Sequence, residues 1–142
     1  MTQSTASVQR SFRLSLDTSN LLDASAEVGS ESRNALVDRL LGEALRTERH
    51  PLVRFRSNAT GRREPLMIGT RLLVRQVIAT VRDHDGDLDD AAVYLEQPTR
   101  ILRAALSYYA EFKPEVDADA EVAARVEANE QTRWEREQVP LA

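Results

Sequence analysis

Apolar and polar side chains alternate along residues 8–16. The apolar positions are Phe12, Leu14 and Leu16, and the polar positions between them are Ser11, Arg13 and Ser15. A period of two predicts a half-buried β-strand, because successive side chains of a strand point to opposite faces. One face of this strand is apolar, and the other is small, polar or cationic.

Two segments of helical spacing follow the predicted strand. In the first, Asp17, Thr18 or Ser19 is expected to cap a helix that ends at Gly29. In the second, Ser30 or Ser32 is expected to provide the cap. The second helix has a broad apolar stripe that runs toward Arg46; its members are Leu36, Val37, Leu40, Leu41, Ala44 and Leu45.

A single strand leaves unpaired backbone groups on both edges, so this strand needs a partner. One candidate is the segment Leu52 to Phe55, and the other is the same strand of a second molecule. We favour the second, which predicts a homodimer joined through the N-terminal strand. A two-stranded ribbon fits the major groove of DNA, and this one would carry two copies of Ser11, Arg13 and Ser15 on its outward face.

The strand, the two helices and the junction Gly29-Ser30-Glu31-Ser32-Arg33 resemble the ribbon-helix-helix family of DNA-binding proteins. The resemblance implies that Ser11, Arg13 and Ser15 contact bases and that Ser30 and Ser32, at the N-terminus of the second helix, hold a phosphate. Arg10 and Gln9 are weaker candidates for contacts to the DNA backbone. The alternative is a packing element with no DNA function.

The middle of the chain predicts two short extended pieces and three helices. The extended pieces are residues 52–55 and 66–68, separated by a turn-rich stretch at residues 57–63. Helical spacing then marks three apolar stripes, with members Val74, Val77, Ile78 and Val81; Leu88, Ala91, Ala92 and Leu95; and Leu102, Ala105, Leu106, Tyr109 and Phe112. A tight connection at Glu96-Gln97-Pro98 gives the last two helices a helix-turn-helix character.

Within this region, the turn Gly69-Thr70-Arg71, the run Ala105-Leu106-Ser107-Tyr108-Tyr109-Ala110 and the preceding Tyr94 resemble the bacterial domain-of-unknown-function family 433. The resemblance implies an antitoxin that partners a small ribonuclease toxin with a PIN-like fold. On the last helix of this region, Arg100 and Arg103 are either groove readers or solvated side chains, and the net negative charge of the segment favours solvated side chains.

Charge changes along the chain. Residues 1–63 carry 10 arginines against 7 acids, residues 64–113 carry 6 basic against 8 acidic groups, and residues 114–142 carry 3 arginines against 8 acids. The acidic tail has only a sparse apolar stripe, which suits a helix that lies in the groove of a partner. We expect its toxin-binding residues to be Val122, Val126, Arg133, Trp134 and Arg136. The alternative is a disordered solubilising tail.

The chain offers little catalytic chemistry. It contains no cysteine, and its two histidines, His50 and His84, fall in predicted turns. The aspartates between Asp83 and Asp90 lack the glycine and glutamate of a calcium loop, so they are interpreted as a turn and the acidic start of a helix. We expect no enzyme activity, no cofactor, no metal and no membrane association, and a cytoplasmic location.

Together these features predict a mainly α protein. Residues 1–48 form a ribbon-helix-helix segment for DNA binding and dimerisation, residues 49–113 a helical, helix-turn-helix-like domain of the family 433 type, and residues 114–142 an acidic, helical toxin-binding tail. The predicted function is that of an antitoxin in a type II toxin-antitoxin module, which neutralises a PIN-like ribonuclease and represses its own operon. The alternative is a dimeric protein-interaction adaptor without DNA binding.

Overall fold

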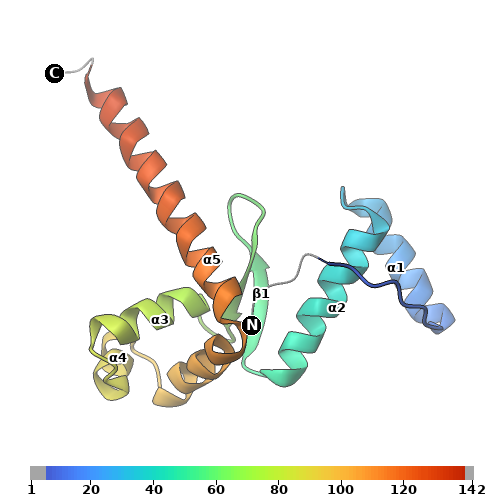
Figure 1. The fold of residues 1–142 in the computed structure, drawn as a ribbon, viewed down its shortest axis with the longest axis horizontal. Coiled ribbons are helices and arrows are strands. Elements are labelled where there is room, and N and C mark those ends of the chain that lie inside the picture. Colours follow the sequence, from blue (N-terminus) through green and yellow to red (C-terminus); the bar gives the residue numbers. More distant parts are fainter. Residues whose placement is uncertain (1–5, 140–142) are drawn as a thin grey trace. The chain divides into compact units, whose positions relative to one another are not determined.

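The computed structural model describes residues 6–139 and is mainly helical. It divides between Pro51 and Leu52 into an N-terminal unit and a C-terminal unit (Figure 1). The N-terminal unit holds the helices α1 (Leu16–Val28) and α2 (Arg33–Arg49). The C-terminal unit holds, in order, β1 (Val53–Ser57), β2 (Arg63–Met67), α3 (Val74–Asp83), α4 (Leu88–Leu95) and α5 (Thr99–Gln138). Across residues 6–139 the model has no helix of the length and apolarity needed to cross a bilayer.

In a single copy of the chain, the N-terminal segment does not form the strand that its alternating sequence predicts. Residues 6–15 form neither helix nor strand, and Leu16, the last apolar position of the predicted strand, is already helical. Ser15 is the N-cap of α1, since its hydroxyl accepts a 3.1 Å hydrogen bond from the backbone N–H of Thr18. The expectation of a cap at Asp17, Thr18 or Ser19 was therefore wrong. Gly29 ends the helix, as predicted.

Helix α2 is capped by one of the two serines that the sequence predicts, Ser30 or Ser32. The hydroxyl of Ser32 accepts a 3.1 Å hydrogen bond from the N–H of Ala35, so Ser32 rather than Ser30 is the cap. The two helices form a helical hairpin with very little interior. Among the described residues of this unit only Leu36 is buried.

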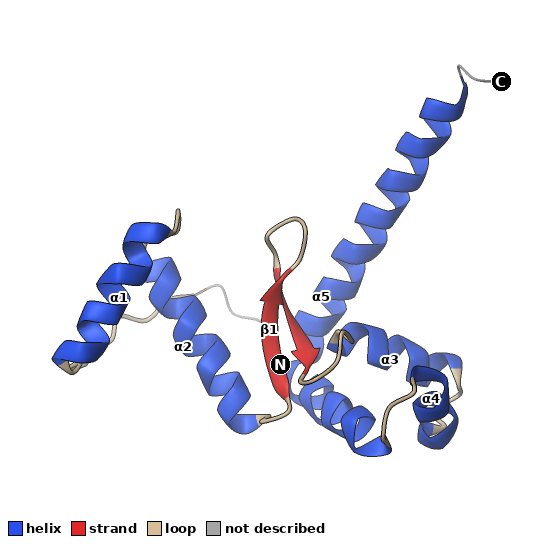
Figure 2. Ribbon diagram, turned by 180° about the vertical axis from the view of Figure 1, so that it is seen from behind, coloured by secondary structure: helices blue, strands red, loops and turns tan. Residues whose placement is uncertain are grey.

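The two extended pieces of the middle region form an antiparallel hairpin, drawn in red in Figure 2. Val53 pairs with Met67 and Ser57 with Arg63, and both Val53 and Met67 are fully buried. Among the described residues the sheet has two strands. Among the described residues, β1 pairs with β2 and the alternative in which residues 52–55 pair with the N-terminal segment is not formed.

Three helices and the hairpin enclose the core of the C-terminal unit. The predicted apolar stripe of α3 is confirmed, with Val74, Val77, Ile78 and Val81 all buried. Helix α4 buries Ala91 and Ala92 as expected. On α5 the predicted residues Leu102 and Ala105 are buried. The structure differs at the tyrosine pair: Tyr108 is fully buried against Phe112 and Phe55, while the predicted Tyr109 is only partly buried.

Helix α5 continues through the predicted domain boundary at residue 113. Phe112 has non-helical angles (φ −118°, ψ 34°), which kink the helix. Pro114 accounts for the kink, because it lacks an N–H and its ring crowds the carbonyl of the preceding turn. Beyond the kink, Val116 and Asp119 are still buried in the C-terminal unit. The expected tail is helical to Gln138, and the far part of the helix projects from the rest of its unit (Figure 1).

Candidate functional site

The N-terminal unit exposes most of its large apolar side chains. Phe12 is 70% exposed, Leu14 53% and Leu41 51%. Together with residues of α1 and α2 they line an apolar groove of about 610 Å³; its members are Phe12, Arg13, Leu14, Thr18, Leu21, Leu22, Ser25, Val37, Leu40 and Leu41. We call this the apolar groove. Its apolar lining comes from the predicted strand and from the faces of both helices that the sequence pattern marked as core.

The predicted DNA-binding residues lie on the same segment and at the start of α2. Ser11, Arg13 and Arg10 are exposed, and the guanidinium carbon of Arg10 lies 5.7 Å from the ring centroid of Phe12. Ser30 is exposed in the turn before α2. Two of the predicted residues, Ser15 and Ser32, already accept a backbone hydrogen bond as helix caps.

The Ser15 hydroxyl also donates a 3.0 Å hydrogen bond to the hydroxyl of Thr18. Both hydrogen-bonding directions of Ser15 are therefore used within α1, which the strand pattern did not indicate. Ser32 keeps its hydroxyl hydrogen for a further acceptor, because only its oxygen is used by the cap. Ser32 consequently remains suited to an anion at the N-terminus of α2.

The predicted toxin-binding residues lie on the last part of α5, which we call the arm (residues 120–139). Val122 and Val126 are half-buried at the base of the arm, whereas Arg133, Trp134 and Arg136 are exposed. Trp134 is 55% exposed, and Arg133 pairs with Glu137 at 3.1 Å. From Glu127 to Val139 every described residue is exposed, so within the C-terminal unit this stretch buries no side chain among the described residues.

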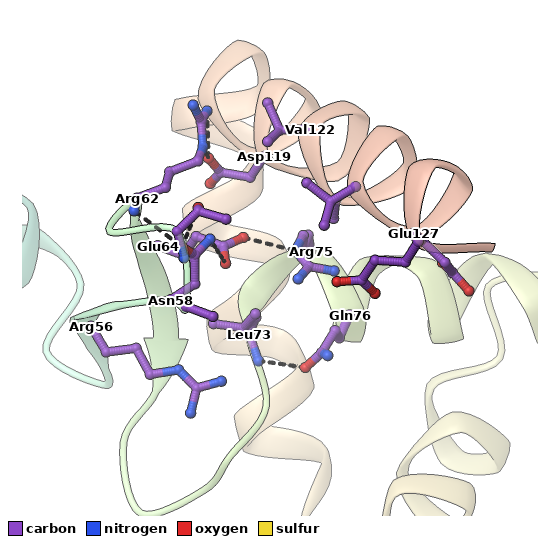
Figure 3. Close-up of a pocket in the computed structure, with 15 residues that line it drawn as sticks. Arg56, Asn58, Arg62, Glu64, Leu73, Arg75, Gln76, Asp119, Val122 and Glu127 are labelled. Carbon is purple, nitrogen blue, oxygen red and sulfur yellow. Dashed lines mark hydrogen bonds and ion pairs between the residues drawn. The ribbon is translucent and has the colours of Figure 1, made fainter. Parts of the chain in front are cut away.

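A cluster of charged residues attaches the base of the arm to the hairpin (Figure 3). The Nε of Arg62 donates a 3.0 Å hydrogen bond to the buried carboxylate of Asp119, 57 residues away in sequence. The buried carboxylate of Glu64 accepts from the Nε of Arg75 at 2.7 Å and from the side-chain amide of Asn58 at 3.2 Å. These buried groups were not recognised in the sequence, because an acid in an acidic segment gives no signal of burial.

Burial and the arginine act in opposite directions on Asp119. Loss of solvation raises the pKa of this carboxyl above its ordinary value, while the hydrogen bond and charge of Arg62 lower it, and burial has the larger effect. The carboxylate is thus held in place by one arginine rather than by solvent. Arg56, Asn58, Val122 and Glu127 complete a groove of about 340 Å³ around the cluster.

Residues of the acidic loop and of the Gly69-Thr70-Arg71 turn have structural roles. Asp87 caps α4 by accepting from the N–H of Asp90 at 3.1 Å, and Asp89 and Asp90 form the acidic first turn of the helix that the sequence predicts. His84 ends α3, with its Nδ1 2.8 Å from the carbonyl of Thr80. The hydroxyl of Thr70 donates to the carbonyl of Met67 at 2.7 Å and closes the Gly69-Thr70-Arg71 turn. No group of three metal-ligating side chains comes together within residues 6–139.

No protein-family model, curated protein or solved structure matches the chain.

Proposed function

We propose that the protein is a homodimeric DNA-binding antitoxin. In this proposal the N-terminal units of two copies bury their apolar grooves against each other and pair their residues 8–14 as a ribbon. The ribbon carries Ser11 and Arg13 to the major groove, and the N-terminus of α2 with Ser30 and Ser32 holds a phosphate. The arm binds a PIN-like ribonuclease and blocks it.

The observation that carries the proposal is the contrast between the sequence pattern and the burial of the N-terminal unit. A unit with two amphipathic helices buries only Leu36 among its described residues, while Leu40, Leu41 and Leu45 remain 43%, 51% and 55% exposed. Contiguous apolar surface of this kind marks an interaction site. A second copy of the chain suits the apolar groove, because a symmetric dimer brings the same surface from each copy into contact: residues 8–14 and the apolar faces of α1 and α2.

Dimerisation is tested with charge placed in the apolar groove. Leu14→Glu and Leu41→Glu should convert the dimer to a monomer in sedimentation equilibrium, since each buries an unpaired carboxylate at the interface. Val93→Glu is the matched control, because Val93 is 78% exposed on α4 in the other unit. A dimer that survives both groove variants would contradict the proposal.

DNA binding is tested on the duplex upstream of the protein's own coding sequence. The wild-type chain should bind it, and Arg13→Ala should weaken binding by about 1–3 kcal/mol if Arg13 contacts a base edge. A dimer with no affinity for this duplex would favour the alternative function, a protein-interaction adaptor.

The antitoxin role rests on the exposed arm and on the resemblance to family 433. A chain that ends after Glu121 keeps Val116 and Asp119 in the core but lacks all five predicted toxin-binding residues. Co-expressed with a PIN-like ribonuclease encoded beside it, this truncated chain should fail to protect the host cell, while the full chain protects it. Protection by the truncated chain would refute the role of the arm.

A further inference from the structure

A groove lies at the base of the arm, around the charged cluster of the hairpin. It has a volume of about 340 Å³ and is lined by the hairpin, the start of α3 and the arm, all within the C-terminal unit. We call it the hairpin–arm groove. Figure 3 shows Val122 and Glu127 on its arm side, and Arg56 and Leu73 on the opposite side. Elements that are distant in sequence thus form one concave surface.

Part of the lining of the hairpin–arm groove is apolar, with contributions from Leu73, Val122, Ala123 and Val126. Val122 and Val126 are one turn apart on the arm and are only half-buried, so both keep exposed apolar surface. The apolar face of α5 therefore ends inside the groove. An apolar side chain of another molecule would gain burial there.

Two ion pairs account for part of the charge in the groove. Arg62 pairs with Asp119 at 2.9 Å, and Arg75 pairs with Glu64 at 2.7 Å. Both carboxylates are buried, whereas their arginines are partly exposed. These pairs therefore belong to the fold and compensate one another within it.

Three further charged side chains line the groove and form no ion pair within residues 6–139: Arg56, Glu127 and Glu130. All three are exposed. Glu127 and Glu130 are neighbours on the surface of the arm, where their like charges repel each other. The groove thus offers two carboxylates on its arm side, a guanidinium on its hairpin side and an apolar lining between them.

From this arrangement we infer that the hairpin–arm groove binds a basic, amphipathic segment of the partner ribonuclease. An apolar side chain of the segment rests on Val122 and Val126. A lysine or arginine of the segment lies between the carboxylates of Glu127 and Glu130, and Arg56 pairs with one of its acidic groups. The inference rests on the proposed function and deepens it, because it adds the hairpin and two acids to the surface that holds the ribonuclease.

The charge on the arm side specifies which surface of the ribonuclease is bound. A protein that binds RNA contacts the phosphates with lysine and arginine side chains. Two neighbouring carboxylates attract such cations and repel a nucleic acid, so the arm side of the groove is complementary to the RNA-binding surface. Cations held by Glu127 and Glu130 no longer contact phosphates. Inhibition is therefore competition with RNA for the same side chains.

The two carboxylates are tested by charge reversal in the full chain. Glu127→Arg/Glu130→Arg should weaken binding to the purified ribonuclease encoded beside the chain by roughly a hundredfold in calorimetric titration, because like charges then face each other. Glu121→Arg/Glu135→Arg is the matched control, since both residues are exposed on the same helix, neither lines the groove and the net charge changes equally. The control should bind within about threefold of wild type. An equal loss in both variants would overturn the inference.

A second set of full-length variants separates the groove from the tip of the arm. Arg133→Ala/Trp134→Ala/Arg136→Ala changes three exposed residues that do not line the groove. This variant should bind the ribonuclease more weakly, and adding the charge reversal of Glu127 and Glu130 should weaken binding further by about tenfold or more. No further loss would contradict a role of the groove.

Competition with RNA tests which surface of the ribonuclease is held. A non-cleavable single-stranded RNA should raise the apparent Kd of the wild-type chain for the ribonuclease in proportion to the RNA concentration. Simultaneous binding of RNA and chain to the ribonuclease would overturn the inference. Direct binding of the RNA by the chain alone, weakened by Arg56→Glu, would mean that the groove holds nucleic acid and would also overturn it.

Failure of the inference and failure of the proposed function give different results. If Glu127→Arg/Glu130→Arg binds like wild type while the chain that ends after Glu121 does not bind, the groove is excluded from the interface and the arm remains in it. A wild-type chain that does not bind the ribonuclease would refute both. Far-UV circular dichroism of each full-length variant verifies that its helices are intact, so a loss of binding is distinguished from a loss of fold.

Discussion

The hydroxyl of Tyr109 donates a 2.7 Å hydrogen bond to the carboxylate of Asp117, and this bond spans the kink of α5 at Phe112. Arg82 of α3 donates to the same hydroxyl at 2.7 Å, and Lys113 pairs with Asp117 at 3.1 Å. The helix after the kink is thereby tied to the helix before it and to α3. This network and the Arg62–Asp119 pair together set the direction in which the arm leaves the C-terminal unit.

Tyr109→Phe removes the central hydroxyl of this network without changing the ring. We expect the free energy of unfolding to fall by about 1 kcal/mol, because the hydrogen bond to a carboxylate is lost at a partly exposed site. The measurement is urea unfolding at neutral pH. Tyr94→Phe is the matched control, since Tyr94 is 71% exposed on α4 and should be neutral.

The pKa of Asp117 links the same network to acid stability. The hydrogen bond from Tyr109 is the largest cause that lowers the pKa of Asp117 below 3.8, and Lys113 and Arg82 act in the same direction. A carboxyl with a lowered pKa in the folded state stabilises the fold above its ordinary pKa, and this contribution is lost as the pH falls through the lowered value. The stability difference between wild type and Tyr109→Phe should therefore shrink below about pH 4. A difference that is constant from neutral to acidic pH would contradict this role.

Asp119 has the opposite pH dependence. Because burial raises its pKa above 3.8 in the folded state, its protonated form favours folding at low pH, and this contribution is lost as the pH rises through the raised value. Arg62→Ala removes the group that lowers this pKa. We expect Arg62→Ala to be destabilising at pH 7, by up to about 3 kcal/mol, because a buried carboxylate loses its partner. The loss should be smaller at pH 4, where more of Asp119 is protonated.

Unfolding of Arg62→Ala, Asp119→Asn and the double variant tests this pairing. Asp119→Asn should be the milder single change, because it removes the buried charge and leaves Arg62 at a site that is 38% exposed. The double variant should be more stable at pH 7 than Arg62→Ala alone. Strict additivity of the two single changes would mean that the two groups do not interact.

Substitutions of Ser15 can distinguish its role as the cap of α1 from a role in contacting DNA. Ser15→Ala should lower the free energy of unfolding by about 1 kcal/mol, because α1 loses its cap. Ser15→Asp restores a good cap and should have nearly wild-type stability, but it places two carboxylates of the dimer beside DNA and should weaken DNA binding. Unchanged DNA affinity in Ser15→Asp would remove Ser15 from the interface.

The thermal unfolding of the full chain should depend on protein concentration. Folding of the N-terminal unit is coupled to dimerisation in our proposal, so dilution favours the unfolded monomer. Calorimetry over a hundredfold range of concentration should show one transition that shifts upward with concentration and a second, assigned to the C-terminal unit, that does not. If the midpoint temperatures of both transitions were independent of protein concentration, the obligate dimer would be contradicted.

The periodic patterns predicted the helices of this chain correctly, and for a physical reason. The spacing of Val74, Val77, Ile78 and Val81 places all four on one face of a helix, and the structure buries all four in the core. The cap at Ser32, one of two predicted alternatives, and the stop at Gly29 were also predicted, because capping depends on neighbours within a few residues. Helical faces, caps and stops can be predicted because they depend on residues that are close together in the sequence.

Features that depend on distant residues were decided by tertiary structure. The alternation at residues 8–16 predicts a strand, yet a strand exists only with a partner, so in a single copy Leu16 joins α1 and Ser15 becomes its cap. Asp119 belongs by composition to an acidic tail, yet Arg62, 57 residues away, makes it part of the fold. The sequence by itself determined the apolar faces of α3 and α4 and the end of α1 at Gly29, but not the start of α1. Only the three-dimensional arrangement decided which charges are buried, because that depends on groups brought together from distant parts of the chain.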